Sequence, residues 1–128
     1  MKKPLQSRPT AGELEILRAL WRLGPSTVRD VHEALRERRV GYTTVLKLLQ
    51  IMTEKGLVKR DESQRAHVYE ARVLQEQTET QLVRDLVDRA FGGSPGRLVM
   101  QALSSRRATP EERDRIRRLL DELEGEGQ

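Results

Sequence analysis

Apolar residues recur at helical spacing in two segments near the start of the chain. The first segment follows the capping box Thr10-Ala-Gly-Glu13 and is expected to run to about Leu23. Gly24-Pro25 ends it, and Thr27 with Asp30 forms a second cap. In each cap the threonine hydroxyl can accept a hydrogen bond from a backbone amide of the first turn. Two helices are therefore predicted before residue 40.

The strongest pattern lies between residues 41 and 71. A helix is predicted after Gly41, with an apolar stripe on one face and hydroxyl, amide and amine groups on the other. Lys55-Gly56 supplies a basic last turn and a glycine stop. The stripe consists of Val45, Leu48, Leu49 and Met52. The polar face consists of Thr43, Lys47, Gln50 and Glu54, with Thr44 beside it near the start of the helix.

Two β-like runs, residues 57–61 and 66–71, follow this helix, and a short charged turn joins them. A hairpin of this size is only marginally stable alone, so we expect Leu57, Val68 and Tyr69 to lean on the helices. A helix followed by such a hairpin predicts a winged helix-turn-helix. That arrangement places its third helix in the major groove of DNA.

Helical periodicity returns at Val73. The next stripe ends at Phe91 before the break Gly92-Gly93, Ser94-Pro95 begins another helix, and Thr109-Pro-Glu-Glu112 caps the last one. Three helices of about fifty residues in total bury too little apolar surface to stand alone, so a second copy is the simplest partner. The expected dimer contacts are Leu82, Leu86, Phe91, Leu98, Val99, Leu103, Ile116, Leu119, Leu120 and Leu123.

These elements predict a mainly α fold with a small β-hairpin. We expect a flexible arm over residues 1–9, a winged-helix DNA-binding domain over 10–72 and a helical dimerisation domain of three helices over 73–128. A dimer of this kind would present two recognition helices to a palindromic operator in double-stranded DNA.

Composition narrows the functions. The 128 residues include no cysteine, which excludes disulfides, thiolate metal sites and cysteine catalysis. The aromatic share of 3% argues against stacking platforms for single strands. No catalytic constellation or phosphate-binding loop is visible, so we expect no enzyme activity, no cofactor and no metal. Without a signal peptide or a long apolar run, the protein is expected to be cytoplasmic, with no membrane insertion.

The charge is uneven along the chain. Residues 1–71 carry 14 Lys and Arg against 9 Asp and Glu, a net charge of +5, whereas residues 72–128 carry 10 against 11, a net charge of −1. A basic half beside a near-neutral half suggests a polyanion-binding module joined to an assembly module. Ordinary surface charge is the alternative.

The chain resembles the penicillinase-repressor family of bacterial transcription regulators (BlaI/MecI/CopY type) from Thr10 to Leu123. Members of that family are cytoplasmic homodimers that bind palindromic operators and repress transcription until a signal releases them. The most specific segments are Tyr42-Thr-Thr-Val-Leu, Met52-Thr-Glu-Lys-Gly-Leu-Val-Lys-Arg60, Ala66-His-Val-Tyr69 and Phe91-Gly-Gly-Ser94 ahead of Leu98-Val99.

The resemblance places the polar face of the third helix in the groove and the wing near phosphates. Where the penicillinase branch is more basic this chain has Leu46, whose side chain could meet a thymine methyl. Tyr42 could pack on the helix start or touch a phosphate. The expected DNA-binding residues are Thr10, Tyr42, Thr43, Thr44, Leu46, Lys47, Gln50, Lys59, Arg60, Arg65 and His67.

The resemblance says less about the releasing signal. In the β-lactam-responsive branch a membrane protease cuts an Asn-Phe bond in the helix after the Gly-Gly break, which makes such a protease a candidate regulatory partner. The matching junction here is Gln101-Ala102, so that cut is not predicted. In the copper-responsive branch a cysteine cluster binds the metal, and this chain has no cysteine.

A second interpretation belongs to another functional class. A winged helix can serve as a protein-interaction module, in which the third helix docks on another protein without specific DNA binding. Steeply salt-dependent binding to DNA would distinguish the two, because phosphate contacts release counterions.

Overall fold

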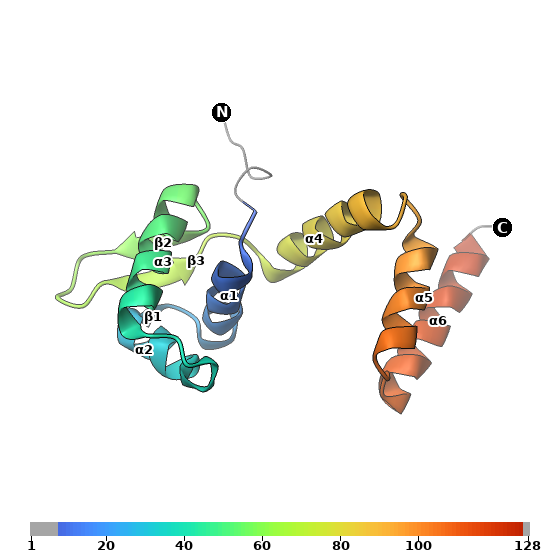
Figure 1. The fold of residues 1–128 in the computed structure, drawn as a ribbon, viewed down its shortest axis with the longest axis horizontal. Coiled ribbons are helices and arrows are strands. Elements are labelled where there is room, and N and C mark those ends of the chain that lie inside the picture. Colours follow the sequence, from blue (N-terminus) through green and yellow to red (C-terminus); the bar gives the residue numbers. More distant parts are fainter. Residues whose placement is uncertain (1–7, 127–128) are drawn as a thin grey trace. The chain divides into compact units, whose positions relative to one another are not determined.

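The computed structural model describes residues 8–126 of the chain (Figure 1). Most of the arm expected at residues 1–9 lies outside the described residues. The chain divides into two compact units between Leu82 and Val83, and each is described by itself. The division falls inside α4 (Gln75–Ala90), C-terminal to the boundary expected at residue 72.

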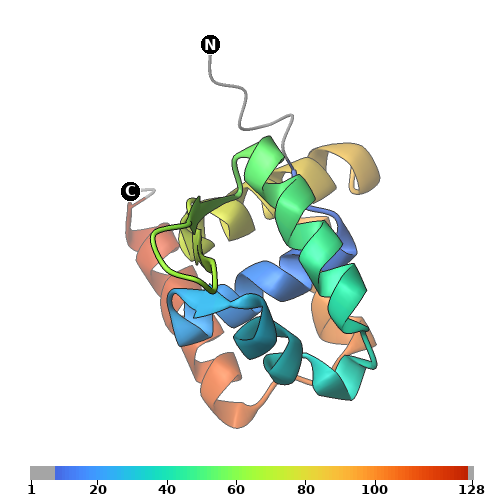
Figure 2. The same ribbon diagram turned by 90° about the vertical axis from the view of Figure 1, so that its left-hand side faces the viewer.

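The first unit is a bundle of three helices with a small sheet beside them (Figures 1 and 2). A one-turn 3-10 helix, η2, follows α2 and leads into the turn before α3. The elements are α1 (Ala11–Leu23), β1 (Ser26–Thr27), α2 (Val28–Ala34), η2 (Arg36–Arg38), α3 (Tyr42–Lys55), β2 (Val58–Asp61) and β3 (Val68–Ala71).

The sheet has three antiparallel strands in the order β1-β3-β2. The predicted hairpin forms β2 and β3, with Val58 opposite Ala71 and Arg60 opposite Tyr69. The short strand β1, which pairs Ser26 with Tyr69, was not predicted. Two residues carry no periodic signal of their own, so β1 exists only because β3 lies beside it.

The core of this unit contains buried side chains from α1, α2, α3, β2 and β3. The predicted stripe is confirmed for Val45, Leu49 and Met52, whose side chains are wholly buried, while Leu48 is partly buried against the core. Of the three side chains expected to anchor the wing, Leu57 and Tyr69 are buried and Val68 is only partly so. Val58, which was not expected there, is buried as well.

The helix ends follow the predicted caps. Thr10 and Thr27 each begin a helix with a complete capping box. The box at Thr109 is confirmed too: its hydroxyl accepts from the Glu112 amide at 3.0 Å. Gly56 ends α3 in the left-handed region at φ 84°, which only glycine adopts without strain.

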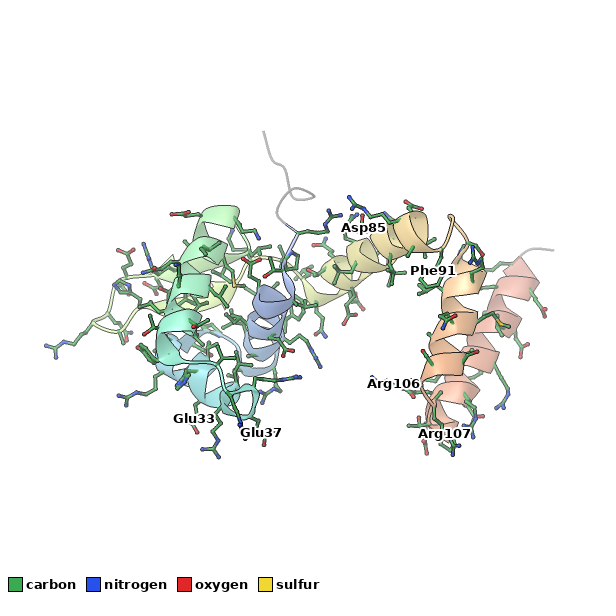
Figure 3. The ribbon with its side chains drawn as sticks, in the orientation of Figure 1. Glu33, Glu37, Asp85, Phe91, Arg106 and Arg107 are labelled. Atoms are coloured by element: carbon green, nitrogen blue, oxygen red, sulfur yellow. The ribbon has the colours of Figure 1, made fainter. Side chains whose placement is uncertain are left out.

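The second unit consists of the end of α4, α5 (Pro95–Ser105) and α6 (Pro110–Glu126). Figure 3 labels Phe91 just after α4 and Arg106 just after α5. Among described residues 83–126, the only buried hydrophobic side chain is Val87, at 8% exposure. This unit therefore has almost no core within a single chain.

Candidate nucleic-acid interface

The polar face of α3 is open along its length. Thr43, Lys47 and Gln50 are exposed on the side of the helix opposite the buried stripe, and Thr44 is exposed beside them. Four side chains that can donate or accept hydrogen bonds thus line one face of a helix whose other face is fixed in the core. A rigid helix of this kind can present such groups to base edges in a major groove.

Two apolar residues of α3 depart from the expected pattern. Leu46 is partly buried and packs against the core, so less of it is available to DNA than the resemblance implies. Ile51 is 37% exposed and lies one turn beyond Lys47. Ile51 was not predicted on the exposed face, because an apolar residue in a helix is ordinarily assigned to the core. Its position outside the apolar stripe is the signal that indicates exposure.

Tyr42 begins α3 and contacts α2. Its ring meets His32 edge-on, with 5.7 Å between the ring centroids, and it remains 48% exposed. The two expectations for Tyr42 are therefore compatible, because the ring packs at the helix start while much of the side chain stays accessible.

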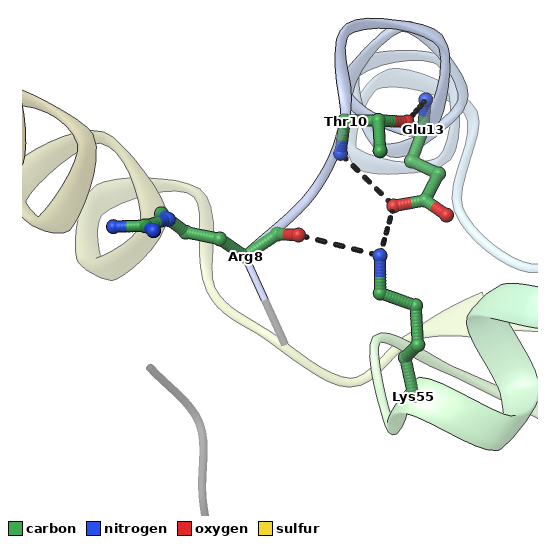
Figure 4. Close-up of polar contacts among 4 residues, drawn as sticks. All are labelled: Arg8, Thr10, Glu13 and Lys55. Carbon is green, nitrogen blue, oxygen red and sulfur yellow. Dashed lines mark hydrogen bonds and ion pairs between the residues drawn. The ribbon is translucent and has the colours of Figure 1, made fainter. Parts of the chain in front are cut away.

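The C-terminal end of α3 is tied to the start of α1 by a partly buried ion pair (Figure 4). The Lys55 ammonium lies 2.7 Å from Oε1 of Glu13, whose side chain is only 3% exposed. The same oxygen accepts from the Thr10 amide at 2.9 Å, and Lys55 also donates to the Arg8 carbonyl at 3.3 Å. The contact fixes one end of α3 against α1.

Thr10 takes part in the same hydrogen-bond network. Its hydroxyl accepts a hydrogen bond from the Glu13 amide at 3.2 Å, although the residue as a whole is exposed. Thr10 therefore has a structural task at the start of α1 besides the DNA contact expected of it.

The four basic side chains expected on the wing differ in their exposure and in whether an ion pair holds them. Lys59 lies 3.7 Å from Glu70 across the hairpin, an exposed pair of the kind that contributes little stability. Arg65 and His67 lie in and beside the loop joining the strands and are exposed. No ion pair holds either of them in the part of the chain that the structure describes.

Arg60 is held within the wing. Its guanidinium lies 2.6 Å from Glu62, and its side chain is 31% exposed. A hydrogen bond with the Tyr69 side chain raises the pKa of Arg60, and the charge of Glu62 raises it further. Arg60 therefore supports the hairpin directly, and Arg65 and Lys59 are its more accessible cations.

The turn between α2 and α3 is basic. Arg38 lies 3.4 Å from Glu15 of α1 and Arg36 lies 2.8 Å from Glu33. Arg39 has φ 58°, the only positive φ of a non-glycine residue among those described. This left-handed conformation ends η2 two residues before Gly41, the N-cap of α3.

The expected dimer contacts are largely uncovered in one chain. Leu86, Val99, Leu103, Leu119, Leu120 and Leu123 are exposed, while Leu82, Phe91, Leu98 and Ile116 are partly buried. The Gln101-Ala102 junction lies inside α5, with both residues exposed. Within residues 8–126, no helix has both the length and the apolar character needed to cross a bilayer.

A helix-turn-helix, a three-stranded sheet whose β2-β3 hairpin forms the wing, and an exposed polar third helix together define the winged-helix fold, which many transcription regulators use to bind DNA. The family model described as penicillinase repressor matches residues 9–122. Two proteins named transcriptional regulator BlaI, from Mycobacterium tuberculosis strains CDC 1551 / Oshkosh and ATCC 25618 / H37Rv, are each 38% identical over 117 residues, 88% of this chain and 84% of the relative. The chain therefore belongs to the penicillinase repressor family of transcriptional repressors.

Proposed function

We propose that the protein is a dimeric, sequence-specific repressor that reads a palindromic operator. In this proposal α3 enters the major groove and the wing lies on the sugar-phosphate backbone. The observation that carries it is the exposed polar face of α3, with its opposite face locked in the core. A helix so held can read bases without first being ordered.

The residues of this face divide into two roles. Lys47 and Gln50 have the reach and the donors for base edges, and Thr43 and Thr44 are placed at the first turn, near the backbone or bases. Ile51 adds an exposed apolar group suited to a thymine methyl. Phosphate contacts fall to Lys59, Arg65 and His67 of the wing, with Arg60 holding the hairpin in shape.

The dimer is supported by the second unit. Its apolar side chains are about half exposed on α5 and α6 when residues 8–126 of a single chain are considered. Exposed leucines at this density mark an interaction surface. A symmetric pair of chains would bury them and would hold two copies of α3 for two half-sites.

The test is binding of the full chain to its own upstream DNA, at two salt concentrations and with an excess of unrelated duplex. We expect a complex with the mass of a dimer that weakens steeply as salt rises. Lys47→Ala should reduce the preference for the operator by about 1–3 kcal/mol. Arg18→Ala, which removes an exposed cation of α1 outside the proposed interface, is the matched control.

A second substitution separates base reading from phosphate binding. Arg65→Ala should weaken operator and unrelated DNA alike and reduce the salt slope by about one. If neither Lys47→Ala nor Arg65→Ala changed DNA binding, the protein-docking interpretation would replace this one.

A further inference from the structure

An arginine-lined groove lies at the turn between α5 and α6. Its volume is about 510 Å³, and its lining combines four arginines with apolar side chains. Arg113 donates to the Ala108 carbonyl and Arg117 pairs with Asp114 at 2.8 Å. Arg106 and Arg107, labelled in Figure 3, have no ion pair in the described chain. Within the described residues, Arg117 is thus the one groove arginine whose charge an ion pair neutralises.

The opposite end of α6 has the reverse charge. Its last turns contain Asp121, Glu122, Glu124 and Glu126, and no basic residue. None of these four carboxylates has an ion pair within the described residues. Negative charge at a helix C-terminus opposes the helix dipole, so this arrangement is unfavourable for the helix alone.

An apolar stripe separates the two charged ends. Ile116, Leu119, Leu120 and Leu123 follow the i, i+3, i+4, i+7 spacing of one helix face. The three leucines are 52–55% exposed, so α5 does not cover them. The stripe is centred between Leu119 and Leu120. All the arginines of α6 precede that centre, together with Glu111, Glu112 and Asp114, of which Asp114 pairs with Arg117. Beyond the centre the charged residues are all carboxylates.

We propose that a second copy lays its α6 antiparallel along this stripe, with a two-fold axis between Leu119 and Leu120, and that opposite charges set this register. The inference rests on the proposed dimer and specifies how its α6 helices meet. About that centre, helical geometry places Glu124 between Arg113 and Arg117 of the second copy, at the arginine groove. It places Arg115 between Glu122 and Glu126 of the second copy.

Charge reversal tests this register. One variant carries Arg113→Glu, Arg115→Glu and Arg117→Glu, and the other carries Glu122→Lys, Glu124→Lys and Glu126→Lys. Alone, each places like charges opposite each other, so its dimer should weaken by about tenfold or more at low salt. Mixed, the two should form a heterodimer close to the parent in affinity, as measured by sedimentation. The lysine variant suits the helix dipole, so its loss of dimer cannot be assigned to a weaker α6.

A cross-link gives an independent measurement, because the chain has no cysteine of its own. Glu124→Cys mixed with Arg117→Cys should form a disulfide between chains under mild oxidation. Glu124→Cys mixed with Arg118→Cys should not, since Arg118 lies on the side of α6 away from the stripe.

The outcomes separate the two proposals. A parent protein that is monomeric at micromolar concentration would overturn the dimer and, with it, the proposed function. A dimeric parent whose two reversed variants dimerise equally well, or whose mixture gains nothing, would overturn only the antiparallel register.

Discussion

At the scale of single residues, the contacts that place α3 come from pairs far apart in sequence. The caps at Thr10 and Thr27 join residues three apart, so the sequence alone predicts them. The pair between Glu13 and Lys55 joins residues 42 apart and exists only after α1 and α3 pack. Both residues lie at helix ends, as their local patterns predicted, but no local pattern relates positions so far apart.

Replacing Lys55 should destabilise the first unit strongly. Lys55→Met leaves the buried Glu13 carboxylate without its cation, which should lower the free energy of unfolding by about 2–3 kcal/mol in urea denaturation. Adding Glu13→Gln to this variant should recover part of the loss. Arg36→Ala, which breaks an exposed pair, is the control and should cost about 0.5 kcal/mol or less. Equal losses for Lys55→Met and Arg36→Ala would show that burial adds nothing to the pair.

The left-handed conformation of Arg39 leads to a second substitution. Arg39→Gly should raise the free energy of unfolding, by up to about 1 kcal/mol, because glycine adopts φ 58° without steric strain. Arg38→Gly should lower it, because residue 38 has an ordinary φ in η2 and an ion pair with Glu15. Thermal melts of the two variants against the parent measure both effects. A loss of stability in Arg39→Gly would mean that the arginine side chain outweighs the strain.

At the scale of elements, prediction succeeded where periodicity is long and failed where it is short. The helix α3 has fourteen residues, and both its apolar stripe and the glycine stop after it were visible in the sequence. The strand β1 has two residues, and the inward face of the wing depends on a register that pairs Arg60 with Tyr69. For that reason the contacts of Arg60 with Glu62 and Tyr69 were not foreseen, while its contact with phosphates stays a prediction.

The turn at the start of the wing loop should respond to acid. The Ser63 amide donates to the Asp61 carboxylate at 2.9 Å, and this hydrogen bond lowers the pKa of Asp61. A lowered pKa in the folded state means that the contact stabilises the turn above the unfolded pKa and is lost as pH falls through the folded one. The titration of Asp61, followed by NMR, should have a lower midpoint than in the unfolded chain. Ser63→Ala keeps the amide and should remove only part of the shift; a midpoint equal to that of the unfolded chain would contradict this account.

At the scale of the whole molecule, the two units differ in how much of their apolar surface is buried within one chain. The first buries a continuous core, whereas the second leaves leucines on α5 and α6 exposed. The sequence indicated this difference, because about fifty residues in three helices cannot cover their own apolar faces. The charge pattern of α6 was also present in the sequence. The proposal of an antiparallel pairing of α6 from this charge pattern needed the groove beside Arg106 and Arg107, which only the structure shows.

A charge placed on the exposed face of α5 should dissolve the proposed dimer while each chain stays folded. Val99→Glu puts a carboxylate on a side chain that is about half exposed in one chain but would be buried between two. We expect a monomer by sedimentation, and operator affinity about 100-fold lower because the two half-sites are no longer linked. Gln101→Glu, on the same helix, is the control and should remain dimeric. A dimeric Val99→Glu would place the interface elsewhere.

The indole of Trp21 donates a hydrogen bond of 3.0 Å to the Val73 carbonyl. Both residues belong to the first unit, so the fluorescence of Trp21 is a spectroscopic label for that unit. Trp21 is the only tryptophan in the chain, so its emission follows the melting of the first unit alone. Circular dichroism sums the helices of both units. If a second copy stabilises the second unit, dilution will lower the melting temperature measured by circular dichroism. The melting temperature measured by Trp21 fluorescence will stay the same.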